Sequence, residues 1–524
     1  MKRPGQNPHR SLMSQLLPTA LACLLVPPAL SAAVYQGNGI KIGEVTANSA
    51  VIWTRLTATP EANWSGAAFL DPTLQGTRPD AALRPAAHEA AIRSADAPSA
   101  ADLRRVVETA DWRTQLPAGR TLAEMHGALP GAAGEVRVLL TPEGGGSPLD
   151  TGWGAVDPAR DHTRQFAVEA LKSGTAYRVR VETRETNGRA GAIVEGAFRT
   201  APAAGAEARV RFSVVTCGDY PRRDDPANGH RIYATMAALD LDFLVHTGDV
   251  EYYDKADPWA TSAELARFKW NRIFAVPFQR SFHNRTAAYF TNDDHDLLKN
   301  DCWPGQTYGA LTWEQGLAIW NEQTPVSSVP YRTFRHGKDV QIWVIEGRRY
   351  RSANNAPDGP GKTILGAAQK EWLLRTIAAS DATFRVLITP TPIVGPDRGN
   401  KNDNHANAGF THEGDELRRF LGAQRNLVVA TGDRHWQYFS TDPATGTREF
   451  GCGPSSDVHA GGYTPRPGDE AVQRFFRLKG GFLTFTAERN DAGPRLSIRH
   501  HAVDGAVVHE ANLTPDGTLS ARAR

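Results

Sequence analysis

The chain has 524 residues, of which 40% are hydrophobic and 22% are charged, and its formal net charge is +2. This length and composition exclude a wholly disordered chain and leave room for more than one domain. The near balance of acidic and basic residues gives no electrostatic reason to expect binding to nucleic acid or to an anionic membrane.

The N-terminus has the pattern of a secretory signal. Three basic residues within the first ten precede an apolar run over 12–30, which ends in small residues at 31–33. The alternative is a short membrane anchor, but prolines interrupt a stretch that is already short for a membrane span. We therefore predict a signal peptide over 1–33 and an exported protein, periplasmic or extracellular, whose mature form has a formal net charge of −1.

Three cysteines follow this leader: Cys217, Cys302 and Cys452. An odd number in an exported protein leaves at least one of them unpaired, as a free thiol or as a ligand. The pairing stays open, with Cys302 and Cys452 the preferred pair because Cys217 has a better use as a ligand.

Strand-like segments flank a region of different composition in the first 200 residues. Residues 37–56 and 163–200 alternate apolar and polar positions around short turn signals, as the first and last strands of one β-sandwich of fibronectin type III kind would. The stretch between them, about 60–160, is rich in Ala, Pro and Gly and is predicted to be a long insertion with a helix over 99–116. We expect one β-sandwich domain over 34–202.

From residue 209 onward, short buried-strand runs alternate with helix-like stretches. Such alternation predicts an α/β domain with at least some parallel strands, which we place over 209–515. The tail from about 480 has the alternation of antiparallel strands. The predicted strands occupy 209–216, 241–247, 340–346, 384–389 and 426–431, and the predicted helices occupy 230–240 and 366–380.

Metal-binding side chains follow several of these strands, at the edge where sites form in open α/β sheets. Asp249 ends a Gly-Asp pair and could bridge two cations, and Tyr252 could return as a phenolate suited to Fe(III). Gly-Asp is also ordinary turn chemistry, so this pair alone is a weak signal. Cys217 is either a buried small hydrophobe or a first ligand, with Asp219 as a second candidate.

Two denser clusters lie farther along the chain. The run Asp-Asp-His-Asp over 293–296 is costly unless it is solvated or neutralised by metal, and its alternative is an exposed acidic loop. Asp433 and His435 stand two residues apart, so both could point to one side of an extended segment as ligands. Their alternative is a capped turn with a surface histidine.

Taken in order, these motifs resemble the metallophosphoesterase superfamily, and specifically the PhoD-like alkaline phosphatases. The run is VVTC, FLVHTGDVEYYD, NDDHD, EGRRYR, ILGAAQKEWL and VVATGDRHW, and the earlier GIKIGEVTANSAVIWTRL is similar to the family's N-terminal β-sandwich. The resemblance covers most of the chain. It implies a four-layer α/β/β/α metallophosphoesterase sandwich over 209–515, preceded by a fibronectin type III-like β-sandwich over 34–202.

The resemblance also implies a set of metal ligands. An iron-like ion, Fe(III), would take Cys217, Asp249 and Tyr252, and Zn is an alternative because it also accepts such ligands. Further cations, with Ca(II) expected, would be held in part by Asp294. The remaining implied ligands are Asp433 and His435 for the first site and Asn300 for the further cations. Whether Asp219 or Asp293 also binds metal stays open.

Two residues carry implied catalytic roles. His295 would lie near the oxygen of the leaving group, and Arg348 would hold a phosphate oxygen. The chain departs from the family pattern at Glu251, which precedes Tyr252 where Ile is usual. It departs again at Arg434, which either adds a phosphate contact or is a solvated side chain.

The predicted function is that of an exported phosphoesterase in which a metal-activated hydroxide attacks the phosphorus of a phosphate mono- or diester. No nucleic-acid-binding surface and no membrane span after signal removal are expected, and the oligomeric state is open. Two alternatives remain: a degenerate, non-catalytic envelope binding protein on the same scaffold, and a hydrolase of another ester class, such as a lactonase or a sulfatase-like enzyme.

Overall fold

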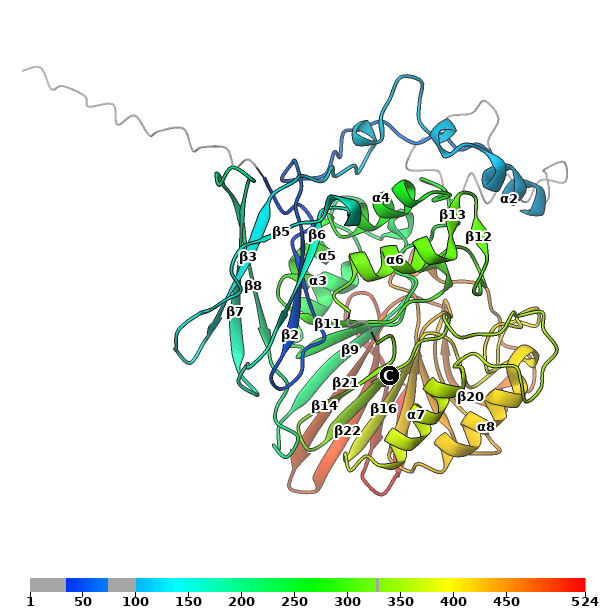
Figure 1. Ribbon diagram of the computed structural model, residues 1–524. Coiled ribbons are helices and arrows are strands. Elements are labelled where there is room, and N and C mark those ends of the chain that lie inside the picture. Colours follow the sequence, from blue (N-terminus) through cyan, green and yellow to red (C-terminus); the bar gives the residue numbers. More distant parts are fainter. Residues whose placement is uncertain (1–33, 74–99, 327–328, 524) are drawn as a thin grey trace, which may run out of the picture. The chain divides into compact units, whose positions relative to one another are not determined.

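Two large β-sheets carry the core of the structure, a computed structural model that describes residues 34–73, 100–326 and 329–523 (Figure 1). The predicted signal peptide lies outside these residues. In spatial order, the ten-stranded sheet contains β24 (Leu519–Ala523), β23 (Val507–Leu513), β22 (Gly493–His501), β21 (Phe482–Asn490), β9 (Val210–Val215), β10 (Phe243–His246), β11 (Ala287–Phe290), β1 (Ile40–Gly43), β2 (Ala50–Arg55) and β6 (Thr163–Val168). The seven-stranded sheet contains β14 (Arg332–His336), β15 (Val340–Val344), β16 (Phe384–Thr389), β17 (Leu427–Thr431), β19 (Arg448–Cys452), β18 (Gln437–Thr441) and β20 (Gln473–Arg477).

Both sheets are mixed. Strands β9, β10 and β11 pair in parallel, as do β15, β16, β17 and β19. The tail strands β21 to β24 pair in antiparallel order, as their alternation predicts. All residues of β10 and β17 are buried, as continuous apolar runs are in parallel strands covered on both faces. The predicted mixed α/β fold is confirmed.

Helices cover the outer face of each sheet. On the ten-stranded sheet, α3 (Arg231–Ala237), α4 (Ala263–Ile273), α5 (Pro277–His283) and α6 (Trp313–Gln323) share a buried cluster with Val215, Leu244 and Phe290. On the seven-stranded sheet, α7 (Ala367–Ala378) and α8 (Thr411–Gly422) pack against Trp343, Leu387 and Val429. Alternate residues of one strand thus face different layers: Leu244 faces helices, whereas Phe243 and Val245 face the other sheet.

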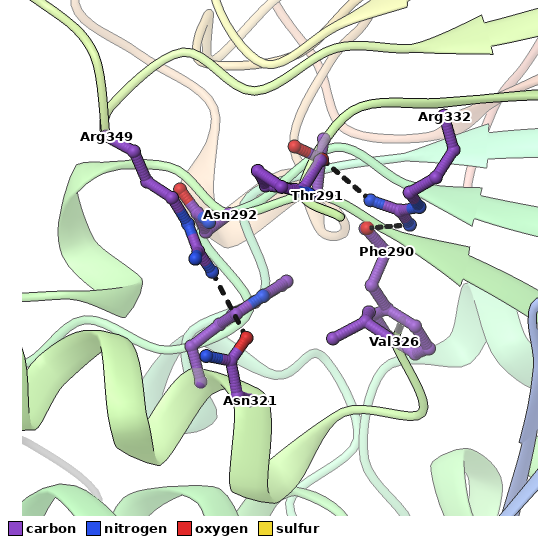
Figure 2. A pocket seen from close by; sticks show the side chains of 9 residues that line it. Phe290, Thr291, Asn292, Asn321, Val326, Arg332 and Arg349 are labelled. Carbon is purple, nitrogen blue, oxygen red and sulfur yellow. Dashed lines mark hydrogen bonds between the residues drawn. The ribbon is translucent and has the colours of Figure 1, made fainter. Parts of the chain in front are cut away.

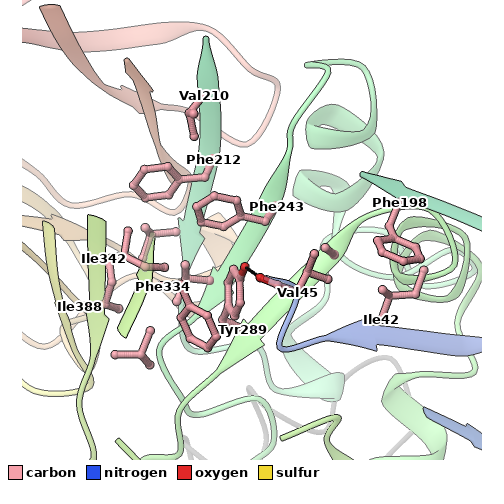
Figure 3. Close-up of a cluster of buried hydrophobic side chains, with 14 of the residues drawn as sticks. Ile42, Val45, Phe198, Val210, Phe212, Phe243, Tyr289, Phe334, Ile342 and Ile388 are labelled. Carbon is pink, nitrogen blue, oxygen red and sulfur yellow. Dashed lines mark hydrogen bonds between the residues drawn. The ribbon is translucent and has the colours of Figure 1, made fainter. Parts of the chain in front are cut away.

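The inner faces of the two sheets meet in an aromatic and aliphatic core. Figure 3 shows Phe212, Phe243 and Tyr289 of the ten-stranded sheet beside Phe334 and Ile342 of the seven-stranded sheet. The rings of Phe212 and Phe243 are stacked with their centroids 4.7 Å apart. This core holds the C-terminal ends of both sets of parallel strands in one region.

The N-terminal strands join the same unit, which spans Ala33–Arg524. Strand β1 pairs with β11, so β1, β2 and β6 extend the ten-stranded sheet. A five-stranded sheet shares their buried cluster and contains β4 (Leu149–Asp150), β3 (Glu135–Pro142), β7 (Ala176–Arg184) and β8 (Ala190–Arg199), with β5 (Gly154–Ala155) paired to β3. Part of the predicted insertion therefore supplies strands, while the fibronectin type III-like domain stays a prediction.

Short elements complete the described chain. No helix in this part of the chain is long and apolar enough to cross a membrane. The remaining elements are α2 (Ala100–Thr109), the two-stranded sheet of β12 (Thr307–Tyr308) and β13 (Leu311–Thr312), and the 3₁₀ helices η1 (Trp112–Gln115), η2 (Leu122–Glu124), η3 (Pro158–Arg160), η4 (Tyr220–Arg222), η5 (Asp294–Asp296), η6 (Ala408–Phe410), η7 (Asp457–His459) and η8 (Asp469–Ala471).

The preferred disulfide between Cys302 and Cys452 is wrong, because Cys217, Cys302 and Cys452 are all free and buried. Cys302 belongs to the helical layer outside the ten-stranded sheet, where its thiol donates to the carbonyl of Asp294 at 3.4 Å. Cys452 lies in the core between the two sheets, and its thiol donates to the carbonyl of Thr431 at 3.4 Å. A sheet therefore separates the two thiols.

A histidine in the inter-sheet core predicts acid lability. His336 lies against the ring of Phe243, and burial lowers its pKa to about 3. The unfolded chain binds this proton near pH 6.5 and the folded chain does not, so the folded state loses stability as the pH falls from about 6.5 towards about 3. We expect His336 to remove about 2 kcal/mol of unfolding free energy between pH 7 and pH 5.

Urea unfolding of the protein and of His336→Phe at the two pH values checks this expectation. The variant cannot titrate at position 336 and should lose less stability than the parent on acidification. An equal loss in both proteins would contradict the assignment.

Candidate metal centre

The predicted ligands follow the C-terminal ends of strands from both sheets. Cys217 follows β9, Asp249 follows β10 and Asp433 follows β17. All three have left-handed backbone conformations, with φ of 51°, 56° and 63°, which residues other than glycine rarely adopt. Such conformations persist where the surrounding structure enforces them, and they are frequent at functional sites.

The glycine before each aspartate allows the loops to approach closely. A Cβ atom on Gly248 would lie 2.5 Å from the backbone nitrogen of Asp293, and one on Gly432 would lie 2.4 Å from Oγ1 of Thr247. Both distances are too short for a side chain. The loops at this edge of the sheet can therefore pack this closely only because glycine precedes each aspartate.

A first group of side chains surrounds one carboxylate oxygen of Asp249. Its Oδ2 lies 3.5 Å from Sγ of Cys217 and accepts a hydrogen bond from the hydroxyl of Tyr252 at 3.0 Å. The same hydroxyl lies 3.1 Å from Nε2 of His435. Ligand atoms of Cys217, Asp249 and His435 all lie within 4.8 Å of one another. The fold thus brings together four of the residues that the sequence suggested.

A second group shares Asp249 with the first. Asp249, Asp294 and His295 each offer a ligand atom, and these atoms also lie within 4.8 Å of one another. Asp294 and His295 belong to η5, directly after β11. Asp249 is the residue common to both groups, which is the position expected of a bridging ligand.

The other suggested ligands lie less directly on these groups. Oδ2 of Asp433 is 3.6 Å from Nη2 of Arg398. Asp219 is buried and faces Arg222 at 3.4 Å. Asn300 is exposed, and its backbone N–H donates to Asp254 at 3.0 Å. The structure therefore does not bring the side chain of Asn300 into either group.

Asp254 orients the candidate catalytic histidine, and the sequence reasoning missed it. Nδ1 of His295 lies 2.6 Å from Oδ1 of Asp254, which leaves Nε2 4.0 Å from Oδ2 of Asp294. Burial alone would lower the pKa of His295, but the carboxylates of Asp254 and Asp294 outweigh burial and raise it. Asp254 is the last residue of the motif GDVEYYD. An acidic residue so close to the other candidate ligands was the only sequence signal for this role.

Both buried arginines of the motifs are tied to acidic residues. Arg348 is 0% exposed; it is hydrogen-bonded to Asp293, and its Nη2 lies 3.4 Å from Asp294. The alternative of a solvated Arg434 is wrong, because its side chain is also buried. Its Nη2 lies 3.6 Å from Asp397, and its Nη1 donates to the carbonyl of Val394 at 3.0 Å.

The donor set fits a metal ion. Burial raises the pKa of the Cys217 thiol and of the Tyr252 phenol, so their anions need a cation beside them. Burial and neighbouring carboxylates also raise the pKa of Asp249. Buried carboxylates without partners cost free energy unless a cation neutralises them. Among the carboxylates suggested as ligands, five oxygens have no hydrogen-bond partner in the described part of the chain: Asp219 Oδ1, Asp249 Oδ1, Asp293 Oδ2, Asp294 Oδ1 and Asp433 Oδ2.

Buried polar residues fix the backbone of the ligand loops. The carboxylate of Asp296 accepts the N–H groups of Asp249 at 2.7 Å and Asp293 at 3.0 Å, and so joins the loops after β10 and β11. Nζ of Lys269 donates to the carbonyl of Tyr252 at 2.5 Å and lies 3.7 Å from Oε2 of Glu251. The unusual Glu251 thus has a buried cationic partner on α4.

Further residues of the region come from loops that the sequence reasoning did not use. Nδ1 of His459 lies 3.1 Å from the carbonyl of Cys217, and its ring lies 4.2 Å from that of His435. Oδ2 of Asp403 lies 3.8 Å from Nη2 of Arg348 and 3.4 Å from Nζ of Lys401. A histidine or aspartate in a long loop carries no strand-end signal, so only the fold reveals these positions.

A small cavity lies behind the acidic loop. Figure 2 shows Asn292 and Arg349 at its wall, with Arg349 hydrogen-bonded to Asn321 at 3.1 Å and Arg332 to the carbonyl of Phe290 at 2.8 Å. Its volume of about 10 Å³ accommodates about one water molecule. This cavity is too small to bind a substrate.

Comparisons with known proteins show which sequences and folds this chain is similar to. The sequence profile described as PhoD-like phosphatase matches residues 212–479. Alkaline phosphatase D of Bacillus subtilis (strain 168) is 25% identical over 338 residues, which cover 54% of this chain and 55% of the relative. The chain thus spans about half the length of this curated relative.

Two solved structures share the fold. One, described as the structure of PhoD, has a TM-score of 0.65 and 17% identity, and the match covers 95% of this chain and 93% of the other. A purple acid phosphatase from yellow lupin (Lupinus luteus) seeds has a TM-score of 0.57 and 11% identity, with 91% and 74% covered. At these identities, the likeness shows the architecture alone.

Proposed function

Because the chain belongs to the PhoD-like phosphatase family, we propose that it is an exported, metal-dependent phosphoesterase acting at the two groups that share Asp249. The observation that carries this proposal is the set of buried carboxylate oxygens without hydrogen-bond partners around Asp249, beside a thiol, a phenol and an imidazole. This donor chemistry suits cations better than any arrangement of neutral groups. The relative named alkaline phosphatase D supports phosphate esters as the substrate class.

The first site would hold Fe(III) through Cys217, Asp249, Tyr252 and His435, with Asp433 beside them, and Zn is the alternative ion. Asp294 would help to hold Ca(II) on the other side of Asp249, since carboxylates are hard oxygen ligands. When bound, such cations lower the pKa of water and offset the negative charge of a phosphoryl group.

Residues of the chain would supply the proton transfer and hold the ligands in place. His295 is held by Asp254 so that Nε2 faces Asp294, and its raised pKa keeps a proton available for the departing alkoxide. Arg348 holds the carboxylates of Asp293 and Asp294 in place from behind. Export follows from the predicted signal over 1–33, and the strands over 34–202 would form a supporting β-sandwich.

The test compares ester classes with and without metal. The purified mature protein should hydrolyse 4-nitrophenyl phosphate or bis(4-nitrophenyl) phosphate much faster than 4-nitrophenyl acetate or sulfate, and chelation should abolish the activity until iron and calcium are restored. Bound metal without turnover of any ester would instead indicate a degenerate binding scaffold. Faster turnover of the acetate or sulfate ester would indicate a hydrolase of another class.

A further inference from the structure

Four partly exposed cationic side chains lie near the candidate centre, and the motif arginines are not among them: Arg222, Lys255, Arg398 and Lys401. Nη2 of Arg398 lies 3.6 Å from Oδ2 of Asp433, and Arg222 lies 3.4 Å from Asp219. Nζ of Lys401 lies 3.4 Å from Oδ2 of Asp403, and Lys255 directly follows Asp254. Each of these four side chains is partly accessible to solvent. Arg348, by contrast, is 0% exposed.

Among these cations, only Arg398 has a buried N–H group near the centre that makes no hydrogen bond within the described residues. Its Nη2 lies 3.6 Å from Oδ2 of Asp433, which is beyond hydrogen-bond distance. That nitrogen is buried and has no hydrogen-bond partner among residues 34–73, 100–326 and 329–523. A buried guanidinium donor without an acceptor is costly, so an anionic oxygen arriving there would relieve the cost.

The guanidinium of Arg398 is also held in position in advance. Its Nε lies 3.4 Å from Oδ1 of Asp397, which accepts the backbone N–H of Arg398 at 2.7 Å. Its charged end lies 5.5 Å from the ring of the buried Trp436, at a distance suited to a cation–π contact. A side chain that is already ordered loses little rotamer entropy when it binds a ligand.

The competing cations have other partners. Arg222 lies 3.4 Å from Asp219, and Lys401 lies 2.5 Å from Asp301 and 3.4 Å from Asp403. Lys255 directly follows Asp254, and its charge acts on the Asp254–His295 pair, on the side of the leaving group. Nη2 of Arg348 also has no hydrogen-bond partner in the described part of the chain, but its guanidinium lies among three carboxylates and the carbonyl of Cys302, and the residue is 0% exposed, whereas Arg398 is partly exposed.

We propose that Arg398, and not Arg348, donates hydrogen bonds to the phosphoryl group of the substrate, and that it favours dianionic phosphate monoesters over monoanionic diesters. The inference rests on the proposed function. A guanidinium presents paired N–H groups that match phosphoryl oxygens, and its attraction grows with the charge of the ligand. Arg348 is then a positioning residue for Asp293 and Asp294.

The test uses Arg398→Met, Arg398→Lys and, as a matched control, Arg466→Met. Arg466 donates to the carbonyl of Asp397 at 3.0 Å, so it holds the same loop, but its side chain is 54% exposed and pairs with Asp469 at 3.6 Å. We measure kcat and KM for 4-nitrophenyl phosphate and bis(4-nitrophenyl) phosphate. Binding of inorganic phosphate is measured by calorimetry, which needs no turnover.

Arg398→Met should raise both the monoester KM and the phosphate Kd by about 10- to 100-fold, the range expected for lost hydrogen bonds to a charged group. The diester KM should rise less, Arg398→Lys should recover part of the loss, and Arg466→Met should match the parent. Unchanged phosphate Kd in Arg398→Met, or an equal rise in Arg466→Met, would overturn the inference. Failure of the parent to turn over any ester would count against the proposed function alone, since the phosphate Kd still tests Arg398.

Discussion

Asp249→Asn should lower kcat/KM on a phosphate monoester by about 1000-fold or more, because the one residue shared by both ligand groups loses its charge. Asparagine tolerates the left-handed backbone at this position, where φ is 56°, so the substitution tests charge and not conformation. The bound metals should be lost with the activity.

The stability of the metal-free proteins separates lost function from misfolding. Burial and four neighbouring carboxylates raise the pKa of Asp249, so its charge is unfavourable without a cation. The metal-free variant should therefore unfold at the same temperature as the metal-free parent or at a higher one.

A matched control lies just before β10, the strand that Asp249 follows. Asp240 is 92% exposed and only faces Arg209 at 3.4 Å, so Asp240→Asn should retain parental kcat/KM and metal. Near-parental turnover in Asp249→Asn, or equal losses in the two variants, would contradict the assignment of the centre.

His295→Ala should lower turnover by about 100- to 10,000-fold on an ester with an alkoxide leaving group, because the departing oxygen then lacks a proton donor. The loss should be much smaller on 4-nitrophenyl phosphate, since 4-nitrophenolate leaves without protonation. The ring of His295 lies 4.1 Å from that of Tyr252, so His295→Gln, which keeps more of the volume, should show the same dependence on the leaving group.

Asp254→Asn provides the companion measurement. Asp254 helps to raise the pKa of His295 against the effect of burial, so its removal should lower that pKa and move the alkaline limb of the pH–rate profile to lower pH. Retention of most of the parental turnover by His295→Ala on the alkoxide ester would contradict this role.

The central strands were predictable because the physics that forms them is local. Runs such as Phe243–His246 and Leu427–Thr431 are apolar throughout, as strands covered on both faces must be. The edge at their C-terminal ends was therefore the expected site, and Cys217, Asp249 and His435 do meet there. Most of the site residues that were predicted correctly follow the ends of these strands.

Other features depend on packing between distant segments. The sequence pattern of Arg348 is that of a motif arginine, but only the folded chain places it behind Asp293, away from solvent. Arg398 and His459 lie in loops without a periodic signal, and the Glu251–Lys269 pair joins a loop to α4. Cysteine pairing cannot be deduced from spacing, and this is why the preferred disulfide was wrong.

Metal content, measured by plasma mass spectrometry on the purified mature protein and on Asp249→Asn, tests the central claim most directly. We expect near-stoichiometric iron together with calcium in the parent, and the loss of both in the variant. A parent without bound metal, or a variant that keeps the parental content, would contradict the metal centre around Asp249.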